Sequence, residues 1–263
     1  MGSENYTLGR GELHFDKFAP GTFNKTGERY LGNTPELNRS TESENLDHYN
    51  SDRGIRVKDK SIVLEKNDSG SFIADEISDE NIALWFLGDV GVVAQTAAAS
   101  IVQVIPASQL KQGTYIQLGE SQANPTGHRN VTVATVTDGA TPTPAPYTVL
   151  DDYTVDAELG RLFIAPGGGI DGTEPITVTY ATAASTRTQV VVGDGTTIEG
   201  ALRFISYNPT GPRRDYYWPY VQLRADGDFA MKGDEWQQLS FAFDILKRDG
   251  YSSEYIDGRP TVA

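Results

Sequence analysis

Apolar and polar residues alternate along much of this chain, which is the two-residue period of β-strands. Residues 236–247 carry Leu239, Phe241, Phe243 and Ile245 on one face and Gln238, Ser240, Ala242 and Asp244 on the other. Residues 176–182 (ITVTYAT) alternate in the same way, and SIVLEK, NVTVATVT, RLFIA, RTQVVVG and ALRFIS are further β-rich runs. The pattern predicts a mainly β protein.

Turn-forming residues lie between these runs and predict antiparallel pairing. Residues 67–70 (NDSG) would link SIVLEK to SFIADE, and residues 156–160 (DAELG) would link YTV to RLFIA. Asp226 and Gly227 favour a hairpin turn, because both positions tolerate a positive φ. Pro219 lies inside the aromatic run YYWPYVQL, and since proline cannot donate to a ladder, this strand should bend or lie at an edge.

One segment, residues 78–88 (SDENIALWFLG), has the pattern of a helix. Its end signals are an N-cap, two acids in the first turn and a glycine just past the end, at Ser78, Asp79, Glu80 and Gly88. Ile82, Trp85 and Phe86 have the spacing of one helical face. We therefore expect one short flanking helix whose apolar stripe lies on a sheet.

Composition narrows the function classes. The chain has 263 residues, 38% of them hydrophobic, and no apolar run at its start, which argues against an integral membrane protein and a secretory signal. Lys and Arg number 22 against 36 Asp and Glu, so a net charge of -14 should repel phosphate backbones and anionic membranes. Zero cysteines exclude thiol catalysis, iron–sulfur clusters and thiolate zinc sites.

Charges are sparse in the middle of the chain. Residues 90–110 contain no ionisable side chain, and between Asp89 and Asp151 the only charges are Lys111, Glu120, Arg129 and Asp138. This stretch ends in the proline-rich run that contains Pro142, Pro144 and Pro146, which predicts a connector or a long loop.

Candidate catalytic motifs have simpler interpretations. Residues 167–172 fit the G-x-G-x-x-G dinucleotide pattern, but Pro175 and another strand follow where a helix is needed, so a hairpin loop is predicted. Residues 213–218 (RRDYYW) mix bases with aromatics, yet a turn that leads into an aromatic strand fits better than a single-strand binding site.

Acids and histidines give no catalytic pattern. The acids at Asp151, Asp152 and Asp156, and at Asp226 and Asp228, suit solvated turns better than glycosidase or calcium sites. His14, His48 and His128 lack metal-binding or triad spacing. We expect no enzymatic activity, no metal and no cofactor, and keep a hydrolase with paired carboxylates as an alternative.

Residues 40–61 (STESENLDHYNSDRGIRVKDKS) mix both charge signs densely between two strand-like runs. The stretch predicts a long charged loop, which is either mobile and solvated or engaged in a contact. Its alternating charges would suit a self-complementary contact with the next copy of the same protein. The charged positions that would take part are Glu42, Glu44, Asp47, Asp52, Arg53, Arg56, Lys58 and Asp59.

The sequence resembles the major tail tube proteins of long, non-contractile-tailed bacteriophages. The resemblance lies in GRGELHFDKF near the start, RYLGNTPELNRSTESENLDHYNSDRGIRVKDKSIVLEK, SDENIALWFLG, and GALRFISYNPTGPRRDYYWPYVQLRADGDFAMKGDEWQQLSFAFDILK. It covers about residues 7–89 and 200–248 and rests on the local sequence of these two segments and on their order along the chain. The resemblance implies a β-sandwich with one flanking helix, whose inner strands join those of neighbours into a closed barrel.

This resemblance also implies a function. Six copies would form a ring, and rings would stack into a tube through which double-stranded DNA passes without specific binding. The partners would be the chain itself, the tape measure protein, and the tail terminator or distal tail proteins. The protein would be a structural component of the virion tail, assembled in the host cytoplasm, with no membrane partner.

In that family a long loop between early strands joins successive rings, which best matches residues 43–57. The corresponding candidates are Glu44, Leu46, Asp47, His48, Tyr49, Asp52, Arg53 and Arg56. Residues 1–92 and 193–263 would then form a discontinuous tail tube domain, and residues 93–192 an inserted β-rich subdomain. The insert could instead make the chain a virion-surface module that binds a glycan or a receptor, and the two roles can coexist.

Overall fold

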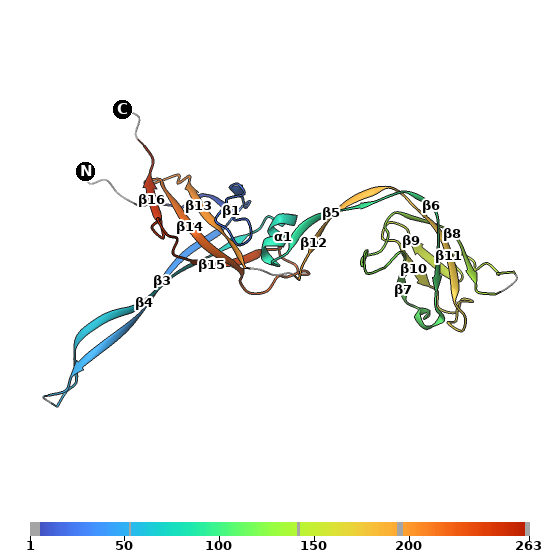
Figure 1. The fold of residues 1–263 in the computed structure, drawn as a ribbon, viewed down its shortest axis with the longest axis horizontal. Helices are drawn as coiled ribbons and strands as arrows, with labels where there is room; N and C mark the ends of the chain where they lie inside the picture. The colour runs from blue at the N-terminus through green and yellow to red at the C-terminus, as the bar shows by residue number, and fades with distance from the viewer. Residues whose placement is uncertain (1–5, 53, 141–142, 194–196, 261–263) are drawn as a thin grey trace. The chain divides into compact units, whose positions relative to one another are not determined.

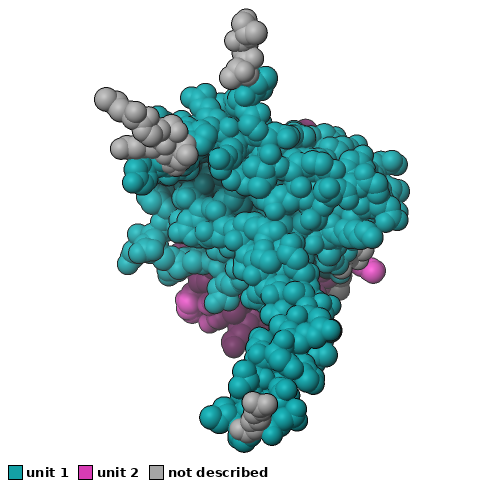
Figure 2. Space-filling view, turned by 90° about the vertical axis from the view of Figure 1, so that its left-hand side faces the viewer, with its two compact units in different colours: residues 1–91, 190–263 teal, residues 92–189 magenta. Residues whose placement is uncertain are grey.

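The computed structural model describes residues 6–52, 54–140, 143–193 and 197–260. The chain divides into two compact units, one of residues 1–91 with 190–263 and one of residues 92–189 (Figure 2). The divisions thus fall at 91/92 and 189/190, where the sequence predicted 92/93 and 192/193. The described secondary structure is mainly β, with several antiparallel sheets and a single α-helix.

The first unit is built on one eight-stranded sheet, here called the main sheet (Figure 1). Its strand order is β2-β1-β13-β14-β15-β4-β3, and β16 pairs with β14 off this path. Each pairing is antiparallel. The strands are β1 (Gly11–Lys17), β2 (Arg29–Tyr30), β3 (Glu36–Asn50), β4 (Val57–Ala74), β13 (Ile198–Ser206), β14 (Arg214–Ala225), β15 (Leu239–Ile245) and β16 (Tyr255–Gly258).

One face of the main sheet holds the hydrophobic core of this unit. Core residues from its strands include Leu13, Phe15, Leu202, Trp218, Val221, Phe72, Phe241 and Phe243. Phe72 stacks on Phe241 with ring centroids 4.8 Å apart. The predicted alternation in β15 is confirmed for Leu239, Phe241 and Phe243, although Ala242 on the other face is also buried.

The predicted helix is present as α1 (Asp79–Trp85), with Ser78 as its N-cap. Its buried face was predicted only in part: Ala83 and Leu84 are buried, while Ile82, Trp85 and Phe86 are half-buried. Of the three predicted residues, Trp85 packs against the core, and its indole N–H donates to the Ser240 carbonyl at 2.9 Å.

The turn predicted at residues 67–70 is wrong, because β4 runs through these residues without a break. Gly70 serves close packing instead. A Cβ at this position would lie 2.3 Å from the Phe243 ring and 2.5 Å from the Asn38 carbonyl oxygen. The glycine therefore marks a place where an aromatic ring lies directly on the backbone of a neighbouring strand.

The other two turns of this kind had different outcomes. β9 (Tyr153–Asp156) and β10 (Arg161–Ile164) pair antiparallel, which confirms the turn over residues 156–160. Gly227 has the expected positive φ of 75°, but β15 begins only at Leu239. Residues 226–238 form a long loop there, not the predicted tight hairpin turn.

Pro219 lies where β14 changes its partner. One edge of β14 has two partners in succession. It pairs with β16 over residues 214–217 and with β15 over residues 221–225. On the opposite edge, the register with β13 shifts between Gly200 and Leu202, opposite the same segment. The predicted irregularity at this proline is therefore confirmed as a bulge.

The second unit consists of two three-stranded sheets that share one hydrophobic core. One sheet has the order β6-β11-β8, with β6 (Ala98–Ile105), β8 (Val131–Asp138) and β11 (Ile176–Thr182); the other has the order β7-β10-β9, with β7 (Tyr115–Gln117). A short 3₁₀ helix, η1 (Ala107–Gln109), follows β6. The chain passes between the units through β5 (Asp89–Gln95) and β12 (Ser185–Val191), which pair with each other.

The glycine-rich residues 167–172 lie in this second unit, between β10 and β11. No helix follows them, as predicted, since β11 begins at Ile176. The predicted hairpin is wrong, because β10 and β11 belong to different sheets. The proline-rich run folds back along β8, where Pro146 bridges Thr137; Pro142 lies outside the described residues.

Candidate assembly surface

The candidate residues lie on a long hairpin formed by β3 and β4. β15 pairs with β4 only from Ser69 to Ala74, so residues 39–68, here called the long hairpin, extend beyond the rest of the main sheet (Figure 1). The burial pattern agrees, because β4 is exposed from Val57 to Asn67 and β3 is almost entirely exposed. Within its own unit the long hairpin thus packs against little besides itself.

The structure corrects the prediction of a long charged loop at residues 40–61. β3 continues to Asn50 and β4 starts at Val57, so most of this stretch is paired strand. The prediction was wrong because side chains of opposite charge on the two paired strands interact with each other. Lys58 forms an ion pair with Asp47 at 2.7 Å, and His48 Nδ1 lies 2.6 Å from Asp59 Oδ1.

The candidates have two locations on the long hairpin. Five are on β3: Glu44, Leu46, Asp47, His48 and Tyr49. Asp52 and Arg56 lie in the connection between the strands, and Arg53 lies outside the described residues. The structure therefore brings the described candidates together at the outer part of one hairpin.

Several of these polar side chains are already satisfied inside the hairpin. Besides Lys58, the Ser61 hydroxyl donates to Asp47 at 2.6 Å, and these hydrogen bonds lower the pKa of Asp47. The Arg56 guanidinium lies 4.6 Å from the centre of the Tyr49 ring. In contrast, Glu44 and Glu65 lie directly opposite each other, and like charges in this position destabilise a strand pair.

Apolar side chains are the feature of the long hairpin that sequence analysis missed. Leu46 on β3 lies directly opposite Ile62 on β4, and these residues are 56% and 46% exposed. Other large hydrophobics exposed on the hairpin are Tyr49, Ile55, Val57, Val63 and Leu64. The available signal was the apolar run of residues 62–64 inside an otherwise charged strand. The outer part of the hairpin is therefore rich in apolar side chains for an exposed surface.

The base of the long hairpin is held by a group of charges. Arg39 Nη2 lies 2.8 Å from Asp68 Oδ1 and 3.3 Å from Glu254 Oε2. Lys66 and the Thr41 hydroxyl also bind Asp68, at 2.9 and 2.8 Å. Burial alone would raise the pKa of Asp68, but these hydrogen bonds outweigh it and lower the pKa below the ordinary 3.8.

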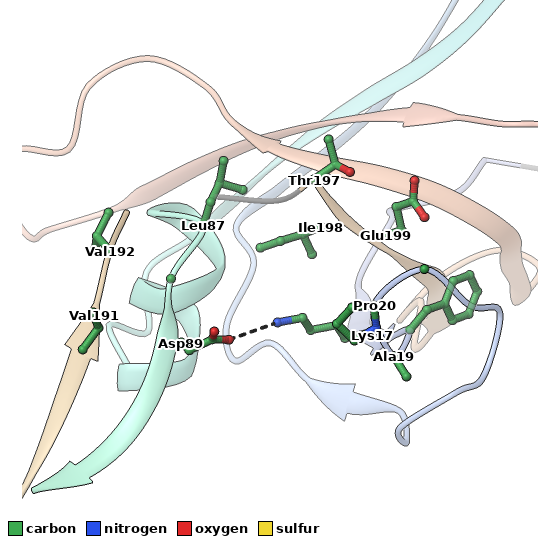
Figure 3. Close-up of a pocket in the computed structure, with 13 residues that line it drawn as sticks. Lys17, Ala19, Pro20, Leu87, Asp89, Val191, Val192, Thr197, Ile198 and Glu199 are labelled. Atoms are coloured by element: carbon green, nitrogen blue, oxygen red, sulfur yellow. Dashed lines mark ion pairs between the residues drawn. The ribbon is translucent and has the colours of Figure 1, made fainter. Parts of the chain in front are cut away.

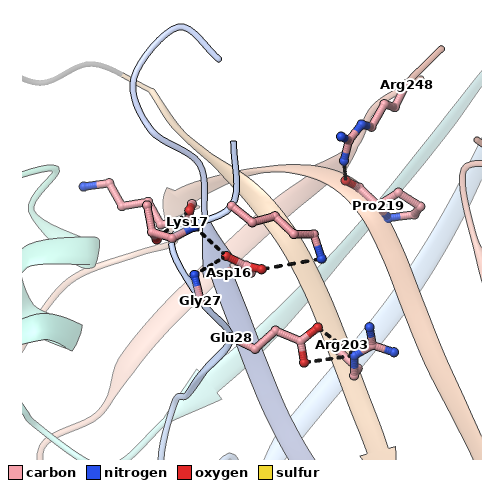
Figure 4. Close-up of polar contacts among 9 residues, drawn as sticks. Asp16, Lys17, Gly27, Glu28, Arg203, Pro219 and Arg248 are labelled. Atoms are coloured by element: carbon pink, nitrogen blue, oxygen red, sulfur yellow. Dashed lines mark hydrogen bonds and ion pairs between the residues drawn. The ribbon is translucent and has the colours of Figure 1, made fainter. Parts of the chain in front are cut away.

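The face of the main sheet opposite the core is here called the polar face, and several of its cations pair with carboxylates (Figure 4). Figure 4 also shows the Arg248 guanidinium, which donates to the Pro219 carbonyl at 3.4 Å. Arg203 forms a two-oxygen ion pair with Glu28, at 2.9 and 3.0 Å. The nearly buried Asp16 accepts from the backbone N–H groups of Thr26 and Gly27 and pairs with Lys25 at 3.5 Å. Arg224 pairs in the same way with Asp244 on the next strand.

A row of side chains crosses five strands on this polar face. The register aligns Tyr30, His14, Arg203, Tyr217 and Tyr255. The Arg203 guanidinium lies 4.4 Å from the centre of the Tyr217 ring, and the His14 and Tyr30 rings are 5.4 Å apart. This face therefore combines tilted aromatic contacts with ion pairs.

A hollow of about 420 Å³ lies near the end of α1 in the first unit (Figure 3). Lys17 and Asp89 point toward each other across it, with 3.8 Å between Nζ and Oδ1. Leu87, Val191 and Ile198 add apolar walls. A lysine paired with one exposed carboxylate stabilises the local fold and does not constitute a catalytic arrangement by itself.

The acids singled out in the sequence mostly shape turns. Asp152 accepts from the backbone N–H groups of Gly169 and Thr148, at 2.6 and 2.7 Å, and these hydrogen bonds lower its pKa. Asp156 accepts from the Leu159 N–H at 3.1 Å, within the predicted turn. Asp226 and Asp228 are exposed in the loop after β14, and Asp151 is exposed as well.

The histidines lie in separate surroundings. His14 belongs to the polar face and His48 to the long hairpin, whereas His128 Nδ1 lies 3.0 Å from the Tyr180 hydroxyl in the second unit. The described residues contain no group of three or more His, Cys, Asp or Glu side chains placed to hold a metal ion. Nor does any described helix have the length and apolar character needed to cross a membrane.

The chain is thus a mainly β protein with a long exposed hairpin. Its sequence matches the family described as "Protein of unknown function UCP028589" over residues 6–247, and the chain belongs to that family. No curated protein matches it.

Proposed function

We propose that the chain is a structural protein of a bacteriophage virion, the subunit of a non-contractile tail tube. Copies would join into hexameric rings, and the rings would stack around a channel for DNA. The proposal starts from the two-block sequence resemblance. The observation that carries it furthest is the long hairpin, on which Leu46 and Ile62, an apolar pair, lie opposite each other and are 56% and 46% exposed.

The long hairpin suits a contact between successive rings. Its tip is about ten residues of β3 beyond Asp68 and Arg39, so at roughly 3.3 Å per residue it reaches about 30 Å past the sheet. The Lys58–Asp47 ion pair and the hydrogen bond between His48 and Asp59 connect the two strands. A second copy would then cover the apolar pair, which is a larger gain than more surface ion pairs would give.

Sideways association is favoured by the edges of the main sheet. β2 and β3 end the strand order, and neither has an outer partner among the described strands. Open edges can pair with another chain, and a cyclic contact that closes on itself limits this growth to a ring. The barrel of the tail tube family would arise in this way, from strands supplied by several copies.

The polar face suits a channel that does not retain DNA. Non-specific DNA binding comes from Lys and Arg groups that release counterions from phosphates. On this face Arg203, Arg224 and Lys25 are each paired with a carboxylate. We assign this face to the lumen, because paired cations on a negatively charged protein offer phosphates few contacts.

Negative-stain electron microscopy of the purified protein tests the proposal. Rings or tubes with a central hole are expected at high protein concentration, and solid particles at every concentration would contradict it. Reversing the charges of Asp52, Arg53 and Arg56 together should shorten or abolish tubes without unfolding the subunit. Antibody labelling of the virion tail would establish where the protein acts.

A second candidate function has one specific observation in its favour. In the second unit, Tyr115 is 51% exposed and its ring lies 4.8 Å from Phe163 and 4.1 Å from the Arg161 guanidinium. An exposed aromatic platform of this kind binds sugar rings or a receptor by stacking. Binding of the full chain to host cells, lost in a Tyr115→Ala variant, would support this surface role.

A further inference from the structure

The loop between β14 and β15 presents a tryptophan to solvent. Trp236 is 94% exposed, the largest exposed fraction among the exposed large hydrophobics of the described chain. Met231 in the same loop is 73% exposed. We call residues 226–238 the tryptophan loop. Since a fully exposed indole is costly in water, this residue needs an explanation beyond the fold.

The tryptophan loop is held in shape from behind. Phe229 is half-buried and packs against Trp85 and Phe86 of the α1 region, with ring centroids 5.8 and 6.0 Å apart. The Gln237 amide donates to the carbonyls of Ala230 and Met231, at 3.1 and 3.3 Å. The loop therefore holds Trp236 outward in an ordered setting, and an ordered anchor loses little entropy on binding.

A groove of about 850 Å³ lies at the other end of the main sheet. Its apolar wall consists of Phe204, Tyr216 and Trp218, with Leu37 opposite, and Arg10, Arg39 and Arg214 also line it. A groove of this volume can accommodate a large side chain together with the residues next to it in sequence. Aromatic walls with arginines at the rim fit an aromatic residue that has acids beside it.

Two polar atoms at this groove lack partners. The Ser206 hydroxyl and the Trp218 indole N–H are buried, with no hydrogen bond among the described residues. Their residues are only 1% and 2% exposed, and both line the groove. A buried donor without an acceptor is costly, and both of these groups can donate. Both atoms are covered by the protein, so they lie behind the groove wall and do not face an incoming ligand.

The tryptophan loop has the complementary chemistry. Asp234 and Glu235 directly precede Trp236, and Asp226 and Asp228 lie in the same loop, which contains one lysine, Lys232. Arg214 makes no ion pair in the described structure, and the Arg10 guanidinium bonds only the Gly9 carbonyl. An acidic loop that carries an exposed tryptophan thus matches a groove whose lining has three arginines and one carboxylate, Glu36.

The aromatic wall of the groove and the tryptophan loop lie at opposite ends of β14. The wall contains Arg214, Tyr216 and Trp218 at the start of the strand, and the loop follows its last residue, Ala225. Trp236 is 94% exposed, so it does not occupy the groove of its own chain. Contact between copies would have the head-to-tail arrangement that produces rings or filaments.

We infer that Trp236 of one copy inserts into the groove of a second copy. Asp234 and Glu235 lie against Arg214 and Arg10 of the receiving copy. This inference rests on the proposed self-assembly and names one contact that produces it. It identifies an anchor residue and its pocket, the arrangement that dominates interface energies.

The test compares Trp236→Ala with Met231→Ala, a variant of the same loop that also removes an exposed apolar side chain. Both should fold as the wild type, as judged by circular dichroism and thermal midpoint. Light scattering against concentration should show that Trp236→Ala raises the concentration needed for assembly by about tenfold or more, whereas Met231→Ala changes it little. Equal behaviour of the two variants would overturn the inference.

Cross-linking gives a second readout, because the chain has no cysteine of its own. A Trp236→Cys protein is mixed with a differently tagged Thr34→Cys protein, since Thr34 lines the groove. Mixed disulfide dimers are expected, and a Ser71→Cys partner on the polar face should give few. No excess of Thr34 dimers would overturn the inference. Rings or tubes of wild type in that case would leave the proposed function standing, and their absence would refute that function separately.

Discussion

Arg39 on β3 and Asp68 on β4 form an ion pair of 2.8 Å where the long hairpin leaves the main sheet. Asp68 is the first residue of β4 beyond its pairing with β15. Glu254, which precedes β16, also contacts Arg39 at 3.3 Å. The hairpin is therefore fastened at its base by charge and carries its apolar side chains farther out.

Acid should weaken this base. Asp68 has a lowered pKa in the folded protein, so its contribution to stability is present above the unfolded value near 3.8 and is lost as the pH falls through the lower folded value. Asp47 and Asp215 follow the same sign. Urea unfolding at pH 7 and below pH 4 should show a falling free energy of unfolding, and Asp68→Asn should lose part of this dependence. A slope unchanged by Asp68→Asn would contradict the assignment.

Adding a charge to the apolar pair should block assembly and spare the fold. Leu46→Asp places a carboxylate against Ile62, which an apolar partner surface cannot accept without a large desolvation cost. Its matched control is Ser43→Asp, which adds the same charge to β3 opposite Lys66. We expect loss of tubes in microscopy for the first variant only, with both within about 1 kcal/mol of wild-type stability. Tubes of normal length from Leu46→Asp would exclude the pair from the interface.

Freeing a cation on the polar face should increase DNA binding. Glu28→Gln removes the carboxylate that neutralises Arg203, so the guanidinium becomes available to phosphates. Gel-shift titration of assembled protein with double-stranded DNA should give tighter binding at low salt, which weakens as salt is added. Glu42→Gln changes the net charge equally on the long hairpin and serves as the control. If both variants bind DNA alike, the polar face is not the surface that meets it.

Gly70 should tolerate no side chain. A Cβ at this position would lie 2.3 Å from the Phe243 ring and 2.5 Å from a backbone oxygen, so Gly70→Ala should lower the free energy of unfolding by about 1–3 kcal/mol. Gly233→Ala is the control, because no atom lies within 4 Å of its added Cβ. Thermal or urea unfolding of the two variants measures the difference. Similar stabilities would mean that the Phe243 ring moves aside freely.

Local patterns predicted most of the strands and the helix, because an element with one buried face has apolar residues at regular intervals in its sequence. Alternation located β15, and the capping Ser78 located α1. Where one residue type is typical of two different structures, the sequence alone could not show which of the two forms. Gly70 resembles a turn glycine but accommodates a ring, and the mixed charges of residues 40–61 resemble a loop but form cross-strand pairs.

The candidate surface was only partly predictable for a related reason. Charges drew attention to Asp47 and His48, which the structure pairs within the hairpin. Ile62 looked like an ordinary strand residue, and only the structure shows that its strand leaves the sheet and exposes it. The apolar run of residues 62–64 was a local signal, but its exposure depends on where the neighbouring strand β15 ends, which the sequence of β4 does not contain.

The two crossings between the units have a consequence for how this chain can change. β5 and β12 pair with each other, so the chain departs and returns at neighbouring points, and each unit keeps its own hydrophobic core. Replacing residues 92–189 by a short Asn-Gly turn should therefore leave the remaining sheet folded, with a cooperative melt by calorimetry; a protein without such a melt would show that the cores are interdependent. Residues 92–189 could then be lengthened, replaced or lost during evolution while the fold of the first unit is preserved.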